Sequence, residues 1–169
     1  INEYGVFRGD KRIGGEKEED TYREMGIKMP PPELREDRGE IEAAAEGRLP
    51  KLIEESDLRG DLHAHTTWSD GRSSLEEMVE AAAKLGLEYI AITDHTKGLG
   101  VARGLDEKRL AEQMQMIDEA NEKLTGFRIL KGTEVDIRSD GSLDLPESAL
   151  AGLDIVVASI HSGFSQPRD

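Results

Sequence analysis

Four histidines are present in the chain, and each ends or follows a stretch with the pattern of a β-strand. His63 and His65 end the first such stretch, His95 follows the second, and His161 follows the fourth. Glu134 lies late in the third. The carboxyl ends of parallel strands meet at one edge of an α/β sheet, so we expect these side chains to meet there.

The spacing of the first two histidines favours a metal site. Residues i and i+2 of a strand project to one face, so both imidazoles can reach the same cation. Asp70 follows in a loop short enough to fold back over the strand end. Neutral imidazoles with carboxylates suit Zn²⁺, Mn²⁺ or Fe²⁺ better than Ca²⁺ or Mg²⁺. The predicted metal ligands are His63, His65, Asp70, His95, Glu134 and His161.

Two further carboxylates could support these ligands. Asp61 shares the strand parity of His63, and Asp136 shares that of Glu134. Each could therefore accept a hydrogen bond from a ligating imidazole. For both residues an ordinary position facing solvent is an equally good interpretation.

The loop after His95 contains glycines and two cations, Lys97 and Arg103. Both cations could bind a phosphate, although charged loop residues usually have no specific partner. Asp94 points away from His95 in an ideal strand, so we expect it to cap a loop or to orient a ligand.

A metal cluster at the open edge of a sheet points to hydrolysis. Bound cations lower the pKa of water to about 7, and ions about 4 Å apart can stabilise both the attacking and the leaving oxygen of a phosphate ester. Glu134 could bridge two such ions. The sequence shows no Ser-His-Asp order, phosphate-binding glycine loop or dinucleotide fingerprint. It also has no cysteine, which excludes disulfides, thiolate metal sites and thiol nucleophiles.

Strands and helices that could position these residues alternate from Leu58 onward. Ser74 and Asp106 have the pattern of residues that cap two helices, and a third, short helix is expected near 146–150. The expected strands are 58–66, 89–93, 127–137 and 154–160. The alternation predicts right-handed βαβ units, and hence an α/β fold with a parallel sheet, either open or closed into a barrel.

Residues 1–57 have a different composition, rich in charge, glycine and proline. We expect a helix at 18–25 and a second, polar helix at 35–48, separated by the extended run Pro30–Pro32. The segment is otherwise predicted to be irregular, as a linker or as the tail of a preceding domain. The predicted domains are therefore 1–57 and 58–169.

The 169 residues include 22 basic and 36 acidic side chains, a net charge of −14. This balance argues against a free-standing domain that binds nucleic acid through a basic face. No apolar run approaches the roughly 20 residues that a membrane span needs. We therefore expect a cytoplasmic protein without a membrane partner.

The second part of the chain resembles the PHP domain (polymerase and histidinol phosphatase) family. The resemblance implies a distorted (βα)₇ barrel whose edge binds about two or three divalent ions, Mn²⁺ or Zn²⁺, through the six predicted ligands. Only about four strands of such a barrel lie in this chain, so we expect the last one to leave an exposed apolar edge. The matching motifs are Asp61–Thr66, Asp70-Gly71, Ile92–His95, Gly132–Asp136 and Ser159–Ser162.

The first part resembles the end of the thumb region of family X DNA polymerases, followed by a connector. The thumb motifs are Asn2–Phe7, Glu18–Tyr22 and Pro31–Glu36, and the connector motif is Gly39–Ala44. This order implies a fragment of a DNA repair enzyme: a metal-dependent 3′–5′ exonuclease that reaches DNA 3′ ends through its parent polymerase. Two alternatives remain open, a stand-alone phosphomonoesterase such as histidinol phosphatase, and a non-catalytic domain that stabilises a polymerase. The sequence does not indicate an oligomeric state.

Overall fold

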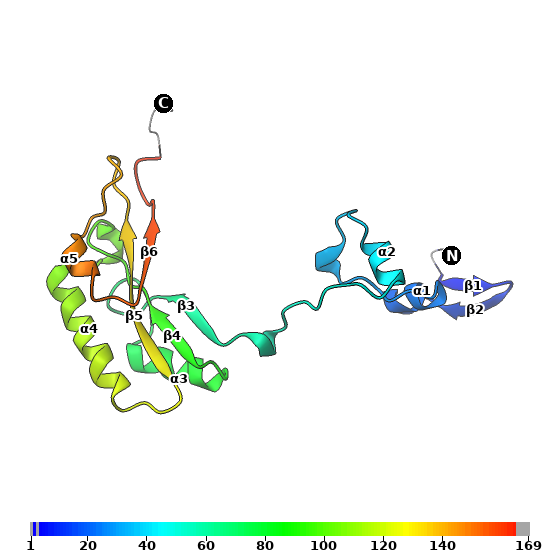
Figure 1. Cartoon of the computed structure of the whole chain (residues 1–169), viewed down its shortest axis with the longest axis horizontal. Coiled ribbons are helices and arrows are strands. Elements are labelled where there is room, and N and C mark those ends of the chain that lie inside the picture. The colour runs from blue at the N-terminus through cyan, green and yellow to red at the C-terminus, as the bar shows by residue number, and fades with distance from the viewer. Residues whose placement is uncertain (1, 3, 165–169) are drawn as a thin grey trace. The chain divides into compact units, whose positions relative to one another are not determined.

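The computed structural model describes residues 2 and 4–164, and the chain divides into two compact units, 1–53 and 54–169. In the second unit a parallel sheet has the strand order β3-β4-β5-β6 (Figure 1). This confirms the predicted α/β class and the four strands. The elements are β3 (Gly60–Ala64), α3 (Leu75–Lys84), β4 (Tyr89–Ile92), α4 (Glu107–Asn121), β5 (Arg128–Asp136), α5 (Glu147–Leu150) and β6 (Ile155–Ser159). Short 3₁₀ turns, η2 (Glu55–Asp57) and η3 (Gly100–Ala102), precede β3 and α4.

Both long helices begin at the predicted capping residues. Ser74 Oγ accepts from the backbone N–H of Glu77 at 3.3 Å, and the Glu77 carboxylate accepts from the Ser74 N–H at 2.9 Å. Asp106 accepts from the N–H of Arg109 at 2.8 Å and so caps α4. Gly86, with φ of +80°, follows α3 in the left-handed region that glycine favours. The caps fix where each βα connection ends.

The core of this unit lies between the helices and the sheet. Helix α3 packs on β4, and α4 packs on β5. Ile92 and Ile129 are buried on neighbouring strands, and Leu75 and Ile117 cover them from the two helices. Burying these aliphatic side chains stabilises the helix-on-sheet arrangement that the sequence pattern predicts.

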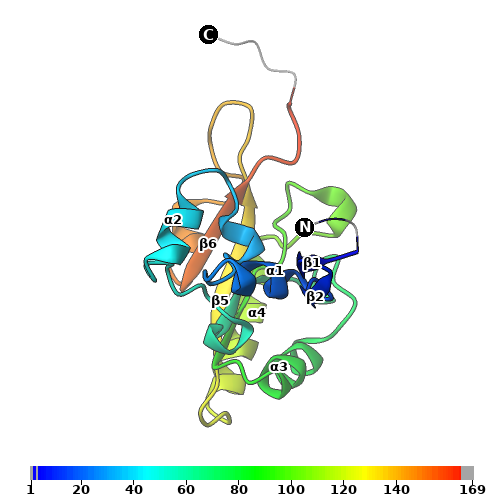
Figure 2. The same ribbon diagram turned by 90° about the vertical axis from the view of Figure 1, so that its right-hand side faces the viewer.

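Strand β6 occupies one end of the sheet order, beside β5 (Figures 1 and 2). Its residues alternate between half-buried and exposed. Val156 is 40% exposed, and Ile160, just after the strand, is 50% exposed. The predicted exposed apolar edge is therefore present at the last strand.

The first unit begins with an antiparallel hairpin, β1 (Val6–Arg8) and β2 (Lys11–Gly14), which the sequence analysis missed. Helix α1 (Glu18–Glu24) lies where the first helix was predicted. Among the described residues, no helix has both the length and the apolar character needed to cross a membrane.

The second predicted helix is present, but it is much shorter than the predicted range 35–48. That region contains only α2 (Glu40–Ala45), after the 3₁₀ turn η1 (Pro32–Leu34). Asp37 and Gly39 have φ of +54° and +89°, outside the right-handed helical region, so the backbone cannot continue as a helix before Glu40.

Candidate metal centre

The carboxyl ends of the four parallel strands carry a cluster of four histidines and Glu134. His63 lies in β3, and His65 is the first residue after that strand. His95 follows β4 and forms a parallel bridge with Glu134 in β5. His161 follows β6. Strand pairing therefore brings together residues that are as far apart in the sequence as 63 and 161.

Glu134 lies at the centre of the cluster, with its side chain 8% exposed. Its Oε2 atom is 3.1 Å from His63 Nε2, 3.2 Å from His65 Nε2 and 3.3 Å from His95 Nδ1. Its Oε1 atom is 3.2 Å from His161 Nε2. The two oxygens of one carboxylate thus face different imidazoles, as a carboxylate that bridges two cations would.

Two imidazoles direct both of their nitrogens at carboxylates. His65 Nδ1 is 3.0 Å from Asp70 Oδ1, and His161 Nδ1 is 2.5 Å from Asp136 Oδ1. When each Nδ1–H donates to its aspartate, the Nε2 lone pair of the neutral ring faces the Glu134 carboxylate. Two electron-rich atoms in that arrangement require a proton or a metal cation between them. Metal-ligating histidines usually donate their other N–H to a carboxylate in this way.

His95 provides a second observation. Its Nδ1 is a buried nitrogen without a hydrogen-bond partner among the described residues, and buried polar groups are normally paired. Its Nε2 lies 3.7 Å from Asp70 Oδ2. The donor atoms form three overlapping sets, each within 4.8 Å: His63, His65 and Glu134; His65, Asp70 and His95; and His95, Glu134 and His161. Three overlapping imidazole–carboxylate sets, two of which share Glu134, fit transition-metal ions.

The local electrostatics differ from residue to residue. Burial raises the pKa of Glu134, but a hydrogen bond with His63 and the nearby imidazole charges outweigh it, so the pKa is lowered overall. The hydrogen bond with His65 lowers the pKa of Asp70. Burial lowers the pKa of His95, whereas the hydrogen bond with Asp136 raises the pKa of His161. Glu134, Asp70 and His95 are thus held in the deprotonated forms that ligate metals.

The other predicted residues have different surroundings. Asp136 is 2.5 Å from His161, the type of contact predicted for it. The Asp61 carboxylate accepts from the backbone N–H of His63 at 2.9 Å rather than from an imidazole. Lys97 pairs with Glu107 at 2.5 Å.

Arg103, the second predicted phosphate ligand, donates to the backbone carbonyl of Ser69 at 2.9 Å. Its own backbone is left-handed, with φ of +55°. The guanidinium therefore joins the loop before α4 to the loop after β3. This contact gives Arg103 a role in holding the two loops together.

Sequence reasoning missed how much Asp94 holds together. Its buried carboxylate accepts four hydrogen bonds, from Thr66 N–H, Thr66 Oγ1, Ser69 Oγ and Gln113 Nε2. Strand parity showed that Asp94 points away from His95, but the buried glutamine that meets it lies on α4, nineteen positions later. The periodicity of α4 indicates its apolar face and not a polar contact within it.

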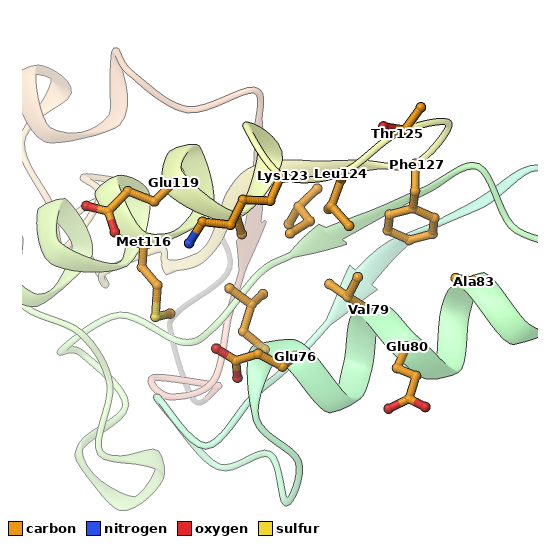
Figure 3. A pocket seen from close by; sticks show the side chains of 13 residues that line it. Glu76, Val79, Glu80, Ala83, Met116, Glu119, Lys123, Leu124, Thr125 and Phe127 are labelled. Atoms are coloured by element: carbon orange, nitrogen blue, oxygen red, sulfur yellow. The ribbon is translucent and has the colours of Figure 1, made fainter.

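A pocket of about 650 Å³ lies between α3 and α4, away from the histidines. Figure 3 shows Val79 and Ala83 of α3 facing Leu124 and Phe127 across it. Its lining contains no histidine and no residue of the three donor sets. The chemistry of this chain is therefore better sought at the strand ends than in this apolar groove.

Comparisons with known proteins agree with this geometry. The family model of the PHP domain matches residues 61–169, and that of the DNA polymerase beta thumb matches residues 1–36. The DNA polymerase/3′-5′ exonuclease PolX of Bacillus subtilis is 46% identical over 172 residues, which cover 99% of this chain and 30% of the relative.

Other relatives match a smaller share of the chain. A probable phosphatase of Thermoanaerobacter sp. is 39% identical over 111 residues, covering 64% of this chain and 43% of the relative. A probable phosphatase of Caldicellulosiruptor saccharolyticus is 39% identical over 107 residues, covering 62% and 42%. The chain spans less than half the length of these relatives. The parallel sheet with its histidine cluster, together with the match over 61–169, shows that the chain belongs to the PHP domain family.

Proposed function

We propose that this chain is the exonuclease part of a family X DNA polymerase, a metal-dependent phosphodiesterase that removes nucleotides from DNA 3′ ends. The observation that carries the proposal is the Glu134 carboxylate, with Oε2 facing His63 and His65 and Oε1 facing His161. In the proposed domain division, residues 1–57 are the end of the polymerase region and its connector, and 58–169 are the first part of the phosphoesterase domain.

The proposed ligands are His63, His65, Asp70, His95, Glu134 and His161, holding Mn²⁺ or Zn²⁺. Such ions would supply a water of lowered pKa and positive charge for the phosphate oxygens. The chain's own contribution is to fix the imidazoles. Asp136 holds the ring of His161 through Nδ1, and Asp70 holds that of His65, so that each Nε2 points inward. Rings held in this way need little reorganisation when a cation binds.

The choice of DNA as the substrate rests on the first unit. The polymerase beta thumb model matches residues 1–36, and the Bacillus subtilis relative covers 99% of the chain, whereas the probable phosphatase of Thermoanaerobacter sp. covers 64%. A DNA substrate also agrees with the net charge of −14 if basic surface for DNA comes from the parent polymerase. A cytoplasmic location is part of this proposal. Lys97 and Arg103 are proposed to contact phosphate only if DNA displaces their present partners, Glu107 and the Ser69 carbonyl.

The test uses the full-length protein that carries this sequence, with a 5′-labelled single-stranded oligonucleotide and Mn²⁺. We expect shortening from the 3′ end, and a loss of at least about 100-fold in the variant His63→Ala/His65→Ala, because one donor set retains only Glu134. Primer extension by the same variant is the control for folding. Shortening that is equal in the variant and the wild type would remove the proposal, and turnover of only a small phosphate monoester would favour the phosphatase alternative.

A further inference from the structure

We propose that Asp94 is a positioning residue of the metal centre: it fixes the loop 66–70 so that the Asp70 carboxylate faces His65 and His95. The inference rests on the proposed metal centre and adds to it a residue that would not touch the ions. It is carried by the contacts of a buried carboxylate that faces away from the cluster.

The Asp94 side chain is fully buried, and both of its oxygens are saturated. Oδ1 accepts from Thr66 N–H at 2.8 Å and from Ser69 Oγ at 2.5 Å. Oδ2 accepts from Thr66 Oγ1 at 2.6 Å and from Gln113 Nε2 at 2.7 Å. A buried carboxylate is costly unless such partners compensate for its lost hydration, so the donors and the carboxylate hold one another in place.

These contacts connect three parts of the fold. Thr66 and Ser69 belong to the loop after β3, and Gln113 belongs to α4. The backbone carbonyl of Asp94 accepts from the N–H of Glu134 at 3.1 Å. A single residue after β4 therefore fixes the loop that carries Asp70 relative to the central glutamate.

Asp70 depends on this support because its side chain is 49% exposed. Its Oδ1 atom is 3.2 Å from Ser69 Oγ, the same hydroxyl that bonds Asp94, and 3.0 Å from His65 Nδ1. A hydroxyl has one proton, and the shorter contact assigns it to Asp94. Because Ser69 directly precedes Asp70 in the chain, fixing Ser69 also fixes the backbone from which the exposed ligand projects.

The experiment separates positioning from general stability. Asp94→Ala and Ser69→Ala are compared with Asn121→Ala in the full-length protein. Asn121 also lies on α4 and makes two hydrogen bonds of 2.9 Å, to the backbone N–H and carbonyl of Ile129 at the opposite end of β5. Its loss weakens the helix–sheet contact without touching the loop.

Two quantities are measured: the dissociation constant for Mn²⁺ added to metal-free protein, and the Mn²⁺ concentration that gives half-maximal shortening of DNA. We expect Asp94→Ala to raise both by about 10-fold or more, as for groups that orient metal ligands, and Ser69→Ala to raise them by less. Asn121→Ala should lower the melting temperature and leave both unchanged. In metal-free protein, amide hydrogen exchange in 65–71 should accelerate in Asp94→Ala and not in Asn121→Ala.

If Asp94→Ala lowers the melting temperature but leaves the Mn²⁺ midpoints at wild-type values, Asp94 only stabilises the fold and the inference is wrong, while the metal centre stands. If the wild type binds no Mn²⁺, both proposals fall. If Asp94→Ala does not fold, Ser69→Ala decides alone, because it removes a single hydroxyl, and unchanged midpoints in that variant overturn the inference.

Discussion

Asp136 shows how one carboxylate can set the orientation of an imidazole. It is mostly buried at the end of β5, and its Oδ1 lies 2.5 Å from His161 Nδ1. This contact directs Nε2 of the same ring toward Glu134 Oε1. His161 follows the last described strand, so without this partner little else in the cluster would orient its ring.

Asp136→Asn is therefore expected to weaken metal binding by about 10-fold, because a neutral amide makes the imidazole a weaker ligand and can favour the wrong tautomer. Titration of metal-free protein with Mn²⁺ measures the effect. Asp140→Asn is the matched control, since Asp140 lies in an exposed turn beyond β5 and accepts hydrogen bonds from Ser142. Equal affinities for the two variants would show that Asp136 does not support His161.

Single residues were predictable where strand parity and strand ends decide their position. His63, His65, His95 and His161 lie at the strand ends that the pattern indicated. The partners of Asp94 were not predictable, because they depend on which side chain of α4 meets the strand end. That meeting is set by packing over long sequence separation and leaves no periodic signal.

The start of helix α3 is set by hydrogen bonds between residues that are close in the sequence. Ser74 and Glu77 cap each other reciprocally, which satisfies N–H groups that the first turn leaves unpaired. The loop that precedes this cap carries Asp70, so the start of α3 limits the length of that loop. Local hydrogen bonding of this kind depends on residues three positions apart and was predicted from the sequence.

Ser74→Ala is expected to lower the free energy of unfolding by about 1 kcal/mol, because the Glu77 N–H loses its acceptor. Urea unfolding followed by circular dichroism measures the change. Ser74→Thr retains a hydroxyl and should recover most of the stability. If Ser74→Ala and Ser74→Thr are both as stable as the wild type, solvent or a neighbour has replaced the cap.

Where local signals conflict, element prediction failed. The polar, alanine-containing stretch 35–48 predicted a helix, but left-handed backbone at Asp37 and Gly39 restricts it to six residues of α2. The hairpin of β1 and β2 was missed because its strands are only three and four residues long. Strands that short give too few alternations to reveal a period.

In the whole molecule, the proposed metal centre takes its residues from the ends of all four parallel strands of the second unit. His63 and His161 belong to the two ends of the sheet order, and Glu134 belongs to β5 between them. A cation bound by these residues would therefore cross-link the sheet. Binding to the folded state alone also shifts the unfolding equilibrium toward that state.

Mn²⁺ is therefore expected to raise the melting temperature of metal-free protein, with about 2.7 kcal/mol of stabilisation at a hundredfold excess over the dissociation constant. Differential scanning calorimetry with and without chelator measures this. Ca²⁺ at the same concentration should have a much smaller effect, because imidazole is a poor ligand for hard cations. The same rise with Ca²⁺, or in His63→Ala/His65→Ala, would argue against binding by the cluster.

The α/β class, the order of the elements in the second unit, the helix caps and the strand ends at which the histidines lie could all be predicted from the sequence alone. Each of these follows from periodicity or from contacts between residues close in the chain. The folded chain alone reveals that Glu134 faces three imidazoles with one oxygen and a fourth with the other, and that Asp94 hydrogen-bonds the loop that carries Asp70. These contacts require the register of parallel strands and the rotation of α4, which are set by packing of the whole core.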